Sequence, residues 1–445
     1  MKTPIADFVN EYARQNISRF HMPGHKGIGA LGCETLDITE IRGADVLYSP
    51  DGIIAESERN ATALFGSSHT YYSTEGSTLA IKAMLALIKK KTPAGRRTRI
   101  LAARNVHKAF IYACALLDLD VDWLFPSNFS HLCECFIAPD ELGAALRGYD
   151  ILPDAVYITS PDYLGNISDL SGLSGVCREY GIPLLVDNAH GAYLAFTKPS
   201  MHPLALGADM CCDSAHKTLP VLTGGAYLHI SKEYAASEDE VRSALSLFAS
   251  TSPSYLILQS LDICNAYLAT DYAQRLGEFI AKLDALSERL SLLGFTPERR
   301  EPLKLVFSSK VCVYSGKELA DHLRDFGIEP EFSDKDYLVL MATPEMTDAD
   351  LEKVYLAFSA LPKAKSERSD ITVIPTRPTR ALSIREAVFS QSEVIPTSEA
   401  AGRICASLIV SCPPAVPVVM SGEIITPNAV EQMLCYRIYS IEVVK

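Results

Sequence analysis

A lysine that follows a short apolar strand is the first feature of this chain that could do chemistry. Ser214-Ala215-His216-Lys217 comes after the apolar run Met210 to Cys212. A Ser-x-His-Lys sequence in this position suits a lysine in Schiff-base linkage to pyridoxal phosphate. Upstream, Leu184 to Asp187 is typical of a buried strand that ends in a carboxylate, where a doubly wound sheet places its ligands.

Lys217 and Asp187 would bind opposite ends of one aromatic ring. The lysine amine would bond to the aldehyde carbon, and the carboxylate would keep the ring nitrogen protonated so that the ring accepts an electron pair. Ser214 and His216 lie beside the lysine and can donate hydrogen bonds to the phosphate. Either Lys217 or Asp187 alone is explained as an ordinary strand end, but together they predict this cofactor.

A phosphate site is predicted at the start of a helix further upstream. Gly76, Ser77 and Thr78 precede the apolar-periodic stretch Leu79 to Lys90. The first backbone N–H groups of a helix are unpaired, and with the helix dipole they bind phosphate. The alternative is a plain Ser/Thr N-cap.

Two histidines follow predicted strands at the same edge of the sheet. His107 comes soon after the strand Arg99 to Ala103 and could stack on the face of the pyridine ring. His190 lies three residues past Asp187 and is a candidate for contacting the substrate carboxylate or for transferring a proton. The alternative for each is a histidine with an ordinary core or surface role.

The order of predicted elements indicates an α/β fold with a mostly parallel central sheet and helices on both faces. The predicted strands and helices are Arg99 to Ala103, Ala155 to Thr159, Leu184 to Asp187, Met210 to Cys212 and Ala226 to Ile230, then helices from Ser254 to about Leu293, strand Leu303 to Phe307, helix Lys317 to Phe326, strand Tyr337 to Ala342 and helix Asp348 to Ser359 with Thr347 as its N-cap. We expect an N-terminal segment at 1–60, a large cofactor-binding domain at 61–295 and a smaller α+β domain at 296–445.

Composition limits the possible partners. The chain has 445 residues, 48% hydrophobic and 21% charged, with a net charge of -13. No basic stripe favours nucleic acid, and no apolar stretch approaches the length of a membrane span, so we expect a cytoplasmic enzyme. The cysteines lack the paired spacing of a zinc site, and we expect buried reduced thiols and no metal.

Four motifs in this order closely resemble the bacterial ornithine/lysine/arginine decarboxylase family over nearly the whole chain. They are His21-Met-Pro-Gly-His-Lys-Gly27, Arg104-Asn-x-His107-Lys108, Asp187-x-Ala-His190-Gly191-Ala192 and Ser214-x-His216-Lys217-Thr218. The resemblance implies the aspartate-aminotransferase-like fold type I of pyridoxal phosphate enzymes.

The resemblance also implies roles for single residues. Lys217 would carry the cofactor, Asp187 would pair with the ring nitrogen and His107 would be the stacking base. The phosphate would be held by Gly76, Ser77, Thr78, Ser214 and His216. The segment Ser250 to Tyr255 resembles the family segment that reaches the phosphate of the neighbouring subunit. Thr251 would therefore contribute to the active site of the partner, which implies a homodimer with shared active sites.

Departures from the family pattern bear on activity. Glu75 stands where the family usually has asparagine, and a carboxylate beside a phosphate is repulsive unless it points away. Ser411 to Pro417 reads SCPPAVP in place of YPPGIP. The resemblance is to short forms without the N-terminal wing domain, so we expect no ring-shaped assembly built through that wing.

The implied function is decarboxylation of arginine, lysine or ornithine to carbon dioxide and an amine of the polyamine type. The alternatives are another fold type I enzyme such as an aminotransferase, or a non-catalytic relative that binds a partner. No motif marks the residue that would bind the distal amine or guanidinium. Glu40, Asp45 and Glu423 are possible anions, each with a structural role as the simpler explanation.

Overall fold

The computed structural model describes residues 1–127, 131–309, 314–362, 377–408 and 415–445. The chain divides into two compact units. The first contains residues 1–94, 155–157 and 170–274, and the second contains residues 95–154, 158–169 and 275–445. The three-part division at residues 60 and 295 stays a prediction.

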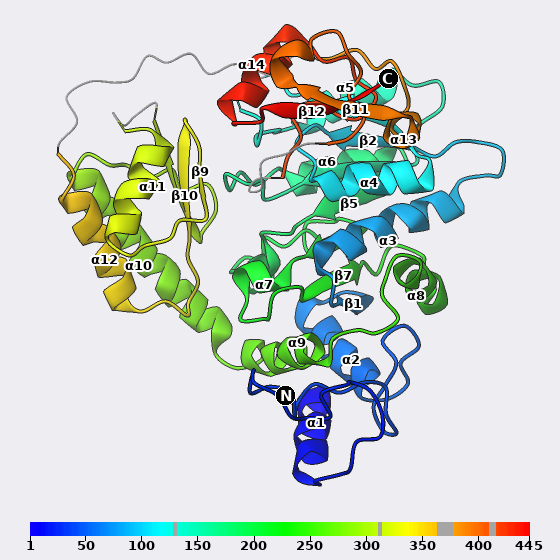
Figure 1. The fold of residues 1–445 in the computed structure, drawn as a ribbon, viewed down its shortest axis with the longest axis vertical. Helices are drawn as coiled ribbons and strands as arrows, with labels where there is room; N and C mark the ends of the chain where they lie inside the picture. The colour runs from blue at the N-terminus through cyan, green and yellow to red at the C-terminus, as the bar shows by residue number, and fades with distance from the viewer. Residues whose placement is uncertain (128–130, 310–313, 363–376, 409–414) are drawn as a thin grey trace. The chain divides into compact units, whose positions relative to one another are not determined.

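Seven strands form the largest sheet, in the order β1-β7-β6-β5-β4-β2-β3 (Figure 1). The strands are β1 (His69–Ser73), β2 (Arg99–Ala103), β3 (Asp120–Leu124), β4 (Ala155–Thr159), β5 (Leu184–Asp187), β6 (Met210–Asp213) and β7 (Ala226–Ile230). β5 and β6 are parallel, as are β2 and β3, whereas β7 runs antiparallel to both β1 and β6. The predicted α/β fold with a mostly parallel sheet is therefore confirmed.

The strands form where short apolar runs end in polar or turn residues. The four residues of β5 and of β6 are all buried, as in a sheet covered on both faces. The predicted bounds of β2, β4, β5 and β7 agree with the structure, and β6 extends one residue further to Asp213. Because parallel strands end at one edge, Asp187 and the segment after Asp213 lie at the same edge of the sheet.

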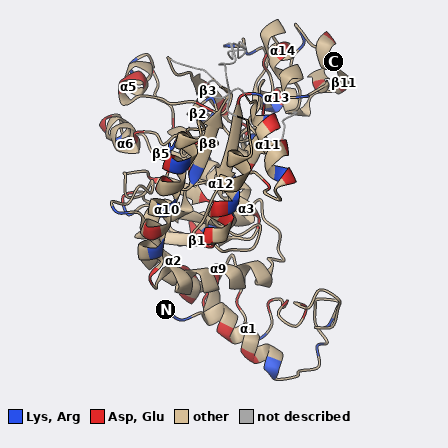
Figure 2. Ribbon diagram, turned by 90° about the vertical axis from the view of Figure 1, so that its left-hand side faces the viewer, with Lys and Arg blue, Asp and Glu red and all other residues tan. Residues whose placement is uncertain are grey.

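Helices of the first unit pack on its strands and on one another. They are α1 (Pro4–Arg14), α2 (Ile53–Phe65), α3 (Gly76–Lys91), α6 (Leu170–Glu179), η1 (Ala192–Phe196), α7 (Ala215–Thr218), α8 (Glu238–Ser246) and α9 (Tyr255–Leu268). α3 packs on β1, β6, β7 and α8, and α1 packs on α2 and α9 (Figure 1). α1 has Asp7 in its first turn and Arg14 in its last turn, and both charges complement the helix dipole (Figure 2).

The second unit contains two small sheets besides its share of the large one. The elements that follow the large sheet are α10 (Tyr272–Leu292, which begins in the first unit), β8 (Lys304–Ser308), α11 (Gly316–Asp325), β9 (Phe332–Ser333), β10 (Tyr337–Met341), α12 (Asp348–Ser359), α13 (Ile384–Phe389), β11 (Ser392–Pro396), η2 (Thr397–Glu399), α14 (Pro427–Cys435) and β12 (Ser440–Val444). α4 (Lys108–Leu117) and α5 (Pro139–Arg147) belong to the same unit. Strand order is β8-β10-β9 in one sheet and β11-β12 in the other.

The predicted elements of this part agree closely with the structure. α12 has the predicted bounds, and Thr347 accepts a hydrogen bond from Asp350 N as its N-cap. β8, β10 and α11 differ from the predicted ranges by one residue at one or both ends. A buried cluster that includes Leu305, Leu338 and Phe358 forms the core of this sheet and its helices.

Among the described residues, no helix is both long and apolar enough to cross a membrane. Ten cysteines lie in the described part of the chain, none of them in a disulfide, and eight are buried.

Candidate functional site

Lys217 and His190 meet at the carboxyl edge of the large sheet. Lys217 lies in α7, which begins two residues after β6 ends, and His190 lies in the turn that follows β5. The Nζ atom of Lys217 is 3.1 Å from Nε2 of His190. A short contact between an amine and an imidazole allows a proton to pass between the two groups.

Asp187 lies at the start of the same turn and is 2% exposed. One of its carboxylate oxygens accepts a hydrogen bond from the Tyr157 hydroxyl at 3.3 Å, and the other accepts one from the Ala189 N–H at 3.2 Å. Burial raises the pKa of Asp187, and the positive charge of Lys217 partly offsets this. A cationic ligand would favour the charged form of this carboxylate further.

The sequence did not predict two residues that contact Asp187, namely Tyr157 and Cys212. The Cys212 thiol lies 3.7 Å from Asp187 Oδ1, on the neighbouring strand, and Tyr157 is fully buried in β4. The pairing of β5 with β6 brings Cys212 to Asp187, because the two residues are register partners and so point to the same face of the sheet. Neither belongs to a motif.

The start of α3 brings together the predicted phosphate-binding residues of two segments. Ser214 Oγ donates to Ser77 Oγ at 2.8 Å, although 137 residues separate them in sequence. Gly76 has a φ of +70°, a left-handed conformation that favours glycine. Its N–H donates to Gly224 O at 2.7 Å, and Thr78 follows in the same turn of the helix. The arrangement leaves hydroxyls and a helix N-terminus together, as an anion site requires.

His216 faces the backbone of the turn that precedes β7. Its Nδ1 lies 3.0 Å from the carbonyl oxygen of Gly225, so Nδ1 carries a proton and donates to that oxygen. Burial lowers the pKa of His216, and the charge of Lys217 lowers it further. Donation from the second ring nitrogen requires the imidazolium form, which a bound phosphate would favour.

Glu75 directs its carboxylate to a neighbouring loop. The Ser250 N–H donates to Glu75 Oε1 at 2.7 Å. Thr251 follows in this loop and is exposed, and Ser254 then caps α9 by accepting from Ile257 N. The hydrogen bond engages the carboxylate that could otherwise repel a phosphate at the start of α3.

His107 belongs to the second unit, whereas the other predicted site residues belong to the first. It is the N-cap of α4, and its Nδ1 accepts a hydrogen bond from Ala109 N at 3.1 Å. That contact leaves the proton of the neutral ring on Nε2. The stacking role of His107 stays a prediction.

The three possible substrate anions all have structural partners. Glu423 forms an ion pair with Arg104 at 2.7 Å, and both side chains are buried. Glu40 accepts from Thr39 Oγ1 at 2.6 Å. Asp45 binds the backbone at the start of α2, accepting from the N–H groups of Val46, Asp51, Gly52, Ile54 and Ala55. Residues 411–414 of the altered segment Ser411 to Pro417 lie outside the described residues, whereas residues 415–417 are described.

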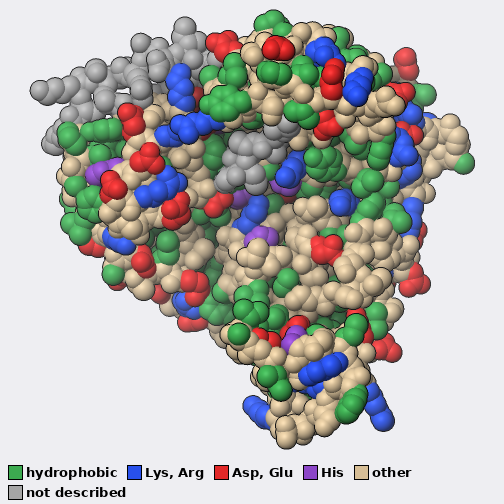
Figure 3. Space-filling model, viewed as in Figure 1, with side chains coloured by type: hydrophobic (Ala, Val, Ile, Leu, Met, Phe, Trp, Pro, Cys, Tyr) green, Lys and Arg blue, Asp and Glu red, His purple; other side chains and the backbone are tan. Residues whose placement is uncertain are grey.

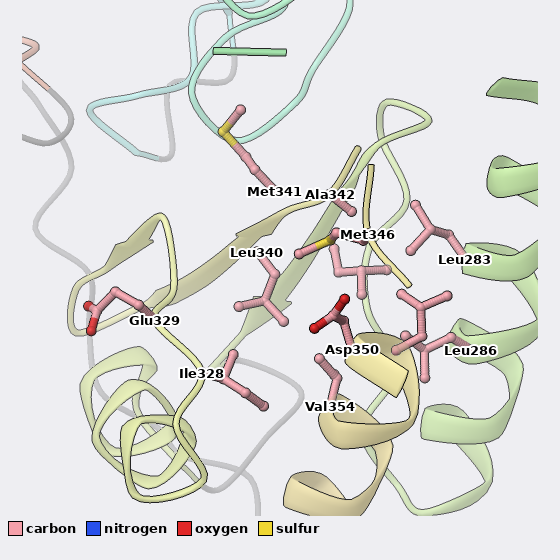
Figure 4. Close-up of a pocket in the computed structure, with 12 residues that line it drawn as sticks. Leu283, Leu286, Ile328, Glu329, Leu340, Met341, Ala342, Met346, Asp350 and Val354 are labelled. Carbon is pink, nitrogen blue, oxygen red and sulfur yellow. The ribbon is translucent and has the colours of Figure 1, made fainter. Parts of the chain in front are cut away.

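A separate pocket of about 60 Å³ in the second unit is lined mainly by leucine, isoleucine and methionine (Figure 4). Its two carboxylates already have partners: Glu329 pairs with Arg324 at 2.9 Å, and Asp350 accepts from Thr347 Oγ1 at 2.7 Å. Both carboxylates of this pocket are therefore engaged by neighbouring residues.

Comparison of the fold with solved structures identifies the class of protein. The fold is similar to that of the lysine decarboxylase LdcF of Francisella novicida, with a TM-score of 0.81 at 16% identity, covering 100% of this chain and 81% of that one. The constitutive lysine decarboxylase of E. coli gives a TM-score of 0.79 at 18% identity, covering 100% of this chain and 82% of that one. A structure described as SPT with PLP gives 0.52 over 69% of this chain and 75% of that one, at 16% identity. The chain thus has the α/β fold of fold type I enzymes.

Sequence comparison identifies the family. Residues 3–291 match the major domain of Orn/Lys/Arg decarboxylase, and residues 368–439 match the C-terminal domain of the same family. The arginine decarboxylase of Bacillus subtilis (strain 168) is 30% identical over 96% of this chain and 91% of its own length. The arginine decarboxylase of Halalkalibacterium halodurans is also 30% identical, over 96% of this chain and 92% of that protein. The chain belongs to the Orn/Lys/Arg decarboxylase family.

Proposed function

We propose that this protein uses pyridoxal phosphate to decarboxylate arginine, lysine or ornithine, with release of carbon dioxide and the corresponding amine. The observation that carries the proposal is the group formed by Lys217, His190 and Asp187. Lys217 Nζ lies 3.1 Å from His190 Nε2, and the turn that holds His190 begins at the buried carboxylate of Asp187. Family membership and the relatives named arginine decarboxylase support this choice of reaction.

The residues present fit the coenzyme. Lys217 supplies a primary amine, Asp187 an anion for a ring nitrogen, and α3 an N-terminus with hydroxyls beside it. A Cβ atom built on Gly76 would meet no atom within 4 Å, so this start of the helix is open to a ligand. Gly76, Ser77, Thr78, Ser214 and His216 would hold the phosphate, and His107 would stack on the ring.

When bound, pyridoxal phosphate would supply an aromatic ring that accepts the electron pair of the bond between Cα and the carboxylate as carbon dioxide leaves. Asp187 would stay ionised against a protonated ring nitrogen, since that positive charge lowers the pKa that burial raises. Lys217 would bind the coenzyme and release the product. His190 would exchange a proton with Lys217 Nζ across their 3.1 Å contact.

Decarboxylation also depends on keeping water away from the reacting carboxylate. Asp187, His190 and Ser214 are 2%, 6% and 2% exposed, so these side chains lie in a largely dehydrated part of the protein. Loss of a charged carboxylate as neutral carbon dioxide is favoured where water is excluded. The burial of these side chains at the sheet edge is consistent with decarboxylation.

A homodimer with shared active sites is part of the proposal. In the N-terminal segment, Phe20, Ile28 and Leu31 are 98%, 82% and 85% exposed. Figure 3 shows hydrophobic side chains on the visible surface of the part that contains α1. Several large apolar side chains exposed within one short segment indicate an interaction surface. We infer that a second copy covers it, with Thr251 completing the phosphate site of that copy.

The direct test measures carbon dioxide released from arginine, lysine and ornithine after addition of pyridoxal phosphate. We expect release from at least one of them and none from the Lys217→Ala variant. A keto acid formed without carbon dioxide would indicate an aminotransferase. A protein that forms no covalent bond with the coenzyme, judged by the absence of a borohydride-sensitive visible band, would be a non-catalytic relative.

A further inference from the structure

A buried carboxylate behind the candidate site receives three hydrogen bonds. Asp213 is the last residue of β6 and is 0% exposed. Its Oδ2 accepts from Nε2 of His202 at 3.0 Å and from Nε2 of His229 at 3.1 Å. Its Oδ1 accepts from the side-chain amide of Asn188 at 2.6 Å.

Strand alternation places this cluster on the sheet face opposite to Asp187. Asp187 and Cys212 are register partners and contact each other, so they share one face. Side chains alternate along a strand, and Asp213 therefore points to the other face. His229 is the β7 partner of Cys211 and lies on the same side as Asp213.

The positions of the ring protons fit an ionised carboxylate. Burial opposes ionisation of Asp213, but the two histidines outweigh it and hold the pKa of Asp213 well below its usual range. Leu204 N–H donates to His202 Nδ1 at 3.4 Å, which leaves the proton of the neutral ring on Nε2, facing Asp213. His229 Nδ1 forms a hydrogen bond with Thr70 Oγ1 at 2.8 Å, so Thr70 binds the ring nitrogen that does not contact Asp213.

The same residue types could bind a metal ion. Ligand atoms of His202, Cys211 and Asp213 all lie within 4.8 Å of one another, and zinc uses these three kinds of ligand. However, the Leu204 N–H bond puts the proton of His202 on Nε2, the nitrogen that a metal would need. Burial also raises the pKa of Cys211 well above normal, which favours the thiol. Hydrogen bonding describes the cluster better than metal binding.

Asn188 connects this cluster to the candidate site. It directly follows Asp187, and its N–H donates to Cys212 O at 3.0 Å, while its carbonyl accepts from Gly191 N at 2.8 Å. The side chain is tightly enclosed, because a Cβ atom at Gly191 would lie 2.0 Å from Asn188 Oδ1. Fixing the Asn188 amide therefore fixes the turn that contains His190.

We propose that Asp213 is a positioning residue for the coenzyme site, and that it acts through Asn188. Its carboxylate holds the turn from Asn188 to Gly191, which in turn holds His190 against Lys217 and keeps Asp187 facing the ring nitrogen. Asp213 itself touches neither coenzyme nor substrate. This inference rests on the proposed function, since it assigns the residue by its effect on that site.

The test is a double-mutant cycle read out by coenzyme affinity. Asp213→Asn, Asn188→Ala and the double variant are titrated with pyridoxal phosphate, and the dissociation constant is taken from the visible absorbance. We expect each single substitution to raise the dissociation constant about tenfold or more, the size of a lost charge-assisted hydrogen bond. The double variant should bind no more weakly than the weaker of the two single variants.

Thr70→Val is the matched control, because it removes the outer hydrogen bond of His229 and leaves the Asn188–Asp213 bond in place. It should change the dissociation constant less than about twofold. The melting temperature of each apoprotein is measured in parallel. If Asp213→Asn fails to fold, Asn188→Ala still tests the link on its own.

Three outcomes would overturn the inference while leaving the proposed function intact. They are an unchanged dissociation constant in folded Asp213→Asn or Asn188→Ala, full additivity in the double variant, and one equivalent of zinc in purified native protein. A native protein that binds no coenzyme would instead overturn the proposed function, and this inference with it.

Discussion

The carboxylate of Glu75 accepts a hydrogen bond from the backbone N–H of Ser250 at 2.7 Å. Glu75 is the N-cap position of α3, and Ser250 comes directly before Thr251 in the loop that leads to α9. The bond therefore joins the proposed phosphate site of one chain to the segment that we propose completes the site of its partner. Glu75 therefore has a specific structural role in this chain.

Subunit complementation tests the shared site. An inactive Lys217→Ala chain is mixed and refolded with a Thr251→Val chain, which we expect to bind the coenzyme weakly. In a shared site, the heterodimer has one site with both defects and one with neither, so activity at limiting coenzyme should recover towards half that of a native dimer. No recovery, despite confirmed subunit exchange, would mean that each chain forms its site alone.

Lys217→Ala should abolish covalent attachment of the coenzyme, because this amine contacts His190 in the turn that follows Asp187, the last residue of β5. The visible band and its loss on borohydride reduction report attachment, and peptide mapping of the reduced native protein locates it. Lys26→Ala and Lys108→Ala are the controls and should keep the band. A label mapped to either of those lysines would contradict the assignment.

Asp187→Asn should keep covalent attachment but lower kcat by about a thousandfold or more, because a neutral amide cannot hold a proton on the ring nitrogen. Asp209→Asn is the matched control. Asp209 accepts from Leu184 N at the other end of β5, so this variant should keep most of its activity. Near-normal turnover in Asp187→Asn would remove Asp187 from its assigned role.

The sequence predicted the strands whose apolar runs stand between clear turn residues, such as β2, β4, β5 and β7. It did not predict β1, His-Thr-Tyr-Tyr-Ser, because these residues lack an apolar period and pair with β7 about 160 positions away. Local patterns carry no information on this long-range pairing. The reversed direction of β7 is different, because β7 also runs antiparallel to β6 across the short connection from Ser214 to Gly225.

The candidate site divides in the same way. Lys217 and His190 follow strands and Asp187 ends one, and they were predicted from the Ser-x-His-Lys run and from the rule that ligands bind at the carboxyl ends of parallel strands. Tyr157 and Cys212 contact Asp187 from within neighbouring strands, and only the order and register of the sheet bring them there. The proposed role of Asn188 depends on its hydrogen bond to the buried carboxylate of Asp213. The sequence shows only that Asp213 lies at the end of a strand and gives no sign of this bond.

Removal of one partner from the Arg104–Glu423 ion pair should destabilise the protein strongly. Both side chains are nearly fully buried, 4% and 3% exposed, so Glu423→Gln would leave the Arg104 charge without a counter-charge. We expect a loss of about 3–5 kcal/mol, measured by denaturant unfolding of the apoprotein. The double variant Arg104→Met/Glu423→Leu should be closer to the native protein. A single variant as stable as the native protein would contradict this.

The pH dependence of stability should contain a contribution from Asp262. Burial raises the pKa of Asp262 to about 6, although hydrogen bonds from Ser57, Ala6 and Ile5 oppose the shift. The folded protein keeps this proton to a higher pH than the unfolded chain, so the contribution is full below the unfolded pKa and is lost as pH rises through about 6. Melting temperatures between pH 4 and 7 should fall more steeply for the native protein than for Asp262→Asn. Parallel melting curves for the two proteins across this pH range would exclude a contribution from Asp262.

The enclosed turn at Gly191 limits how this enzyme can be altered. Any side chain at position 191 would collide with the amide oxygen of Asn188, which itself is bound to Asp213. Variant libraries made to change substrate preference should therefore lose nearly all members that replace this glycine, whatever residue they introduce. A deep mutational scan should show position 191 as one of the least tolerant in the chain, and useful diversity should be sought elsewhere.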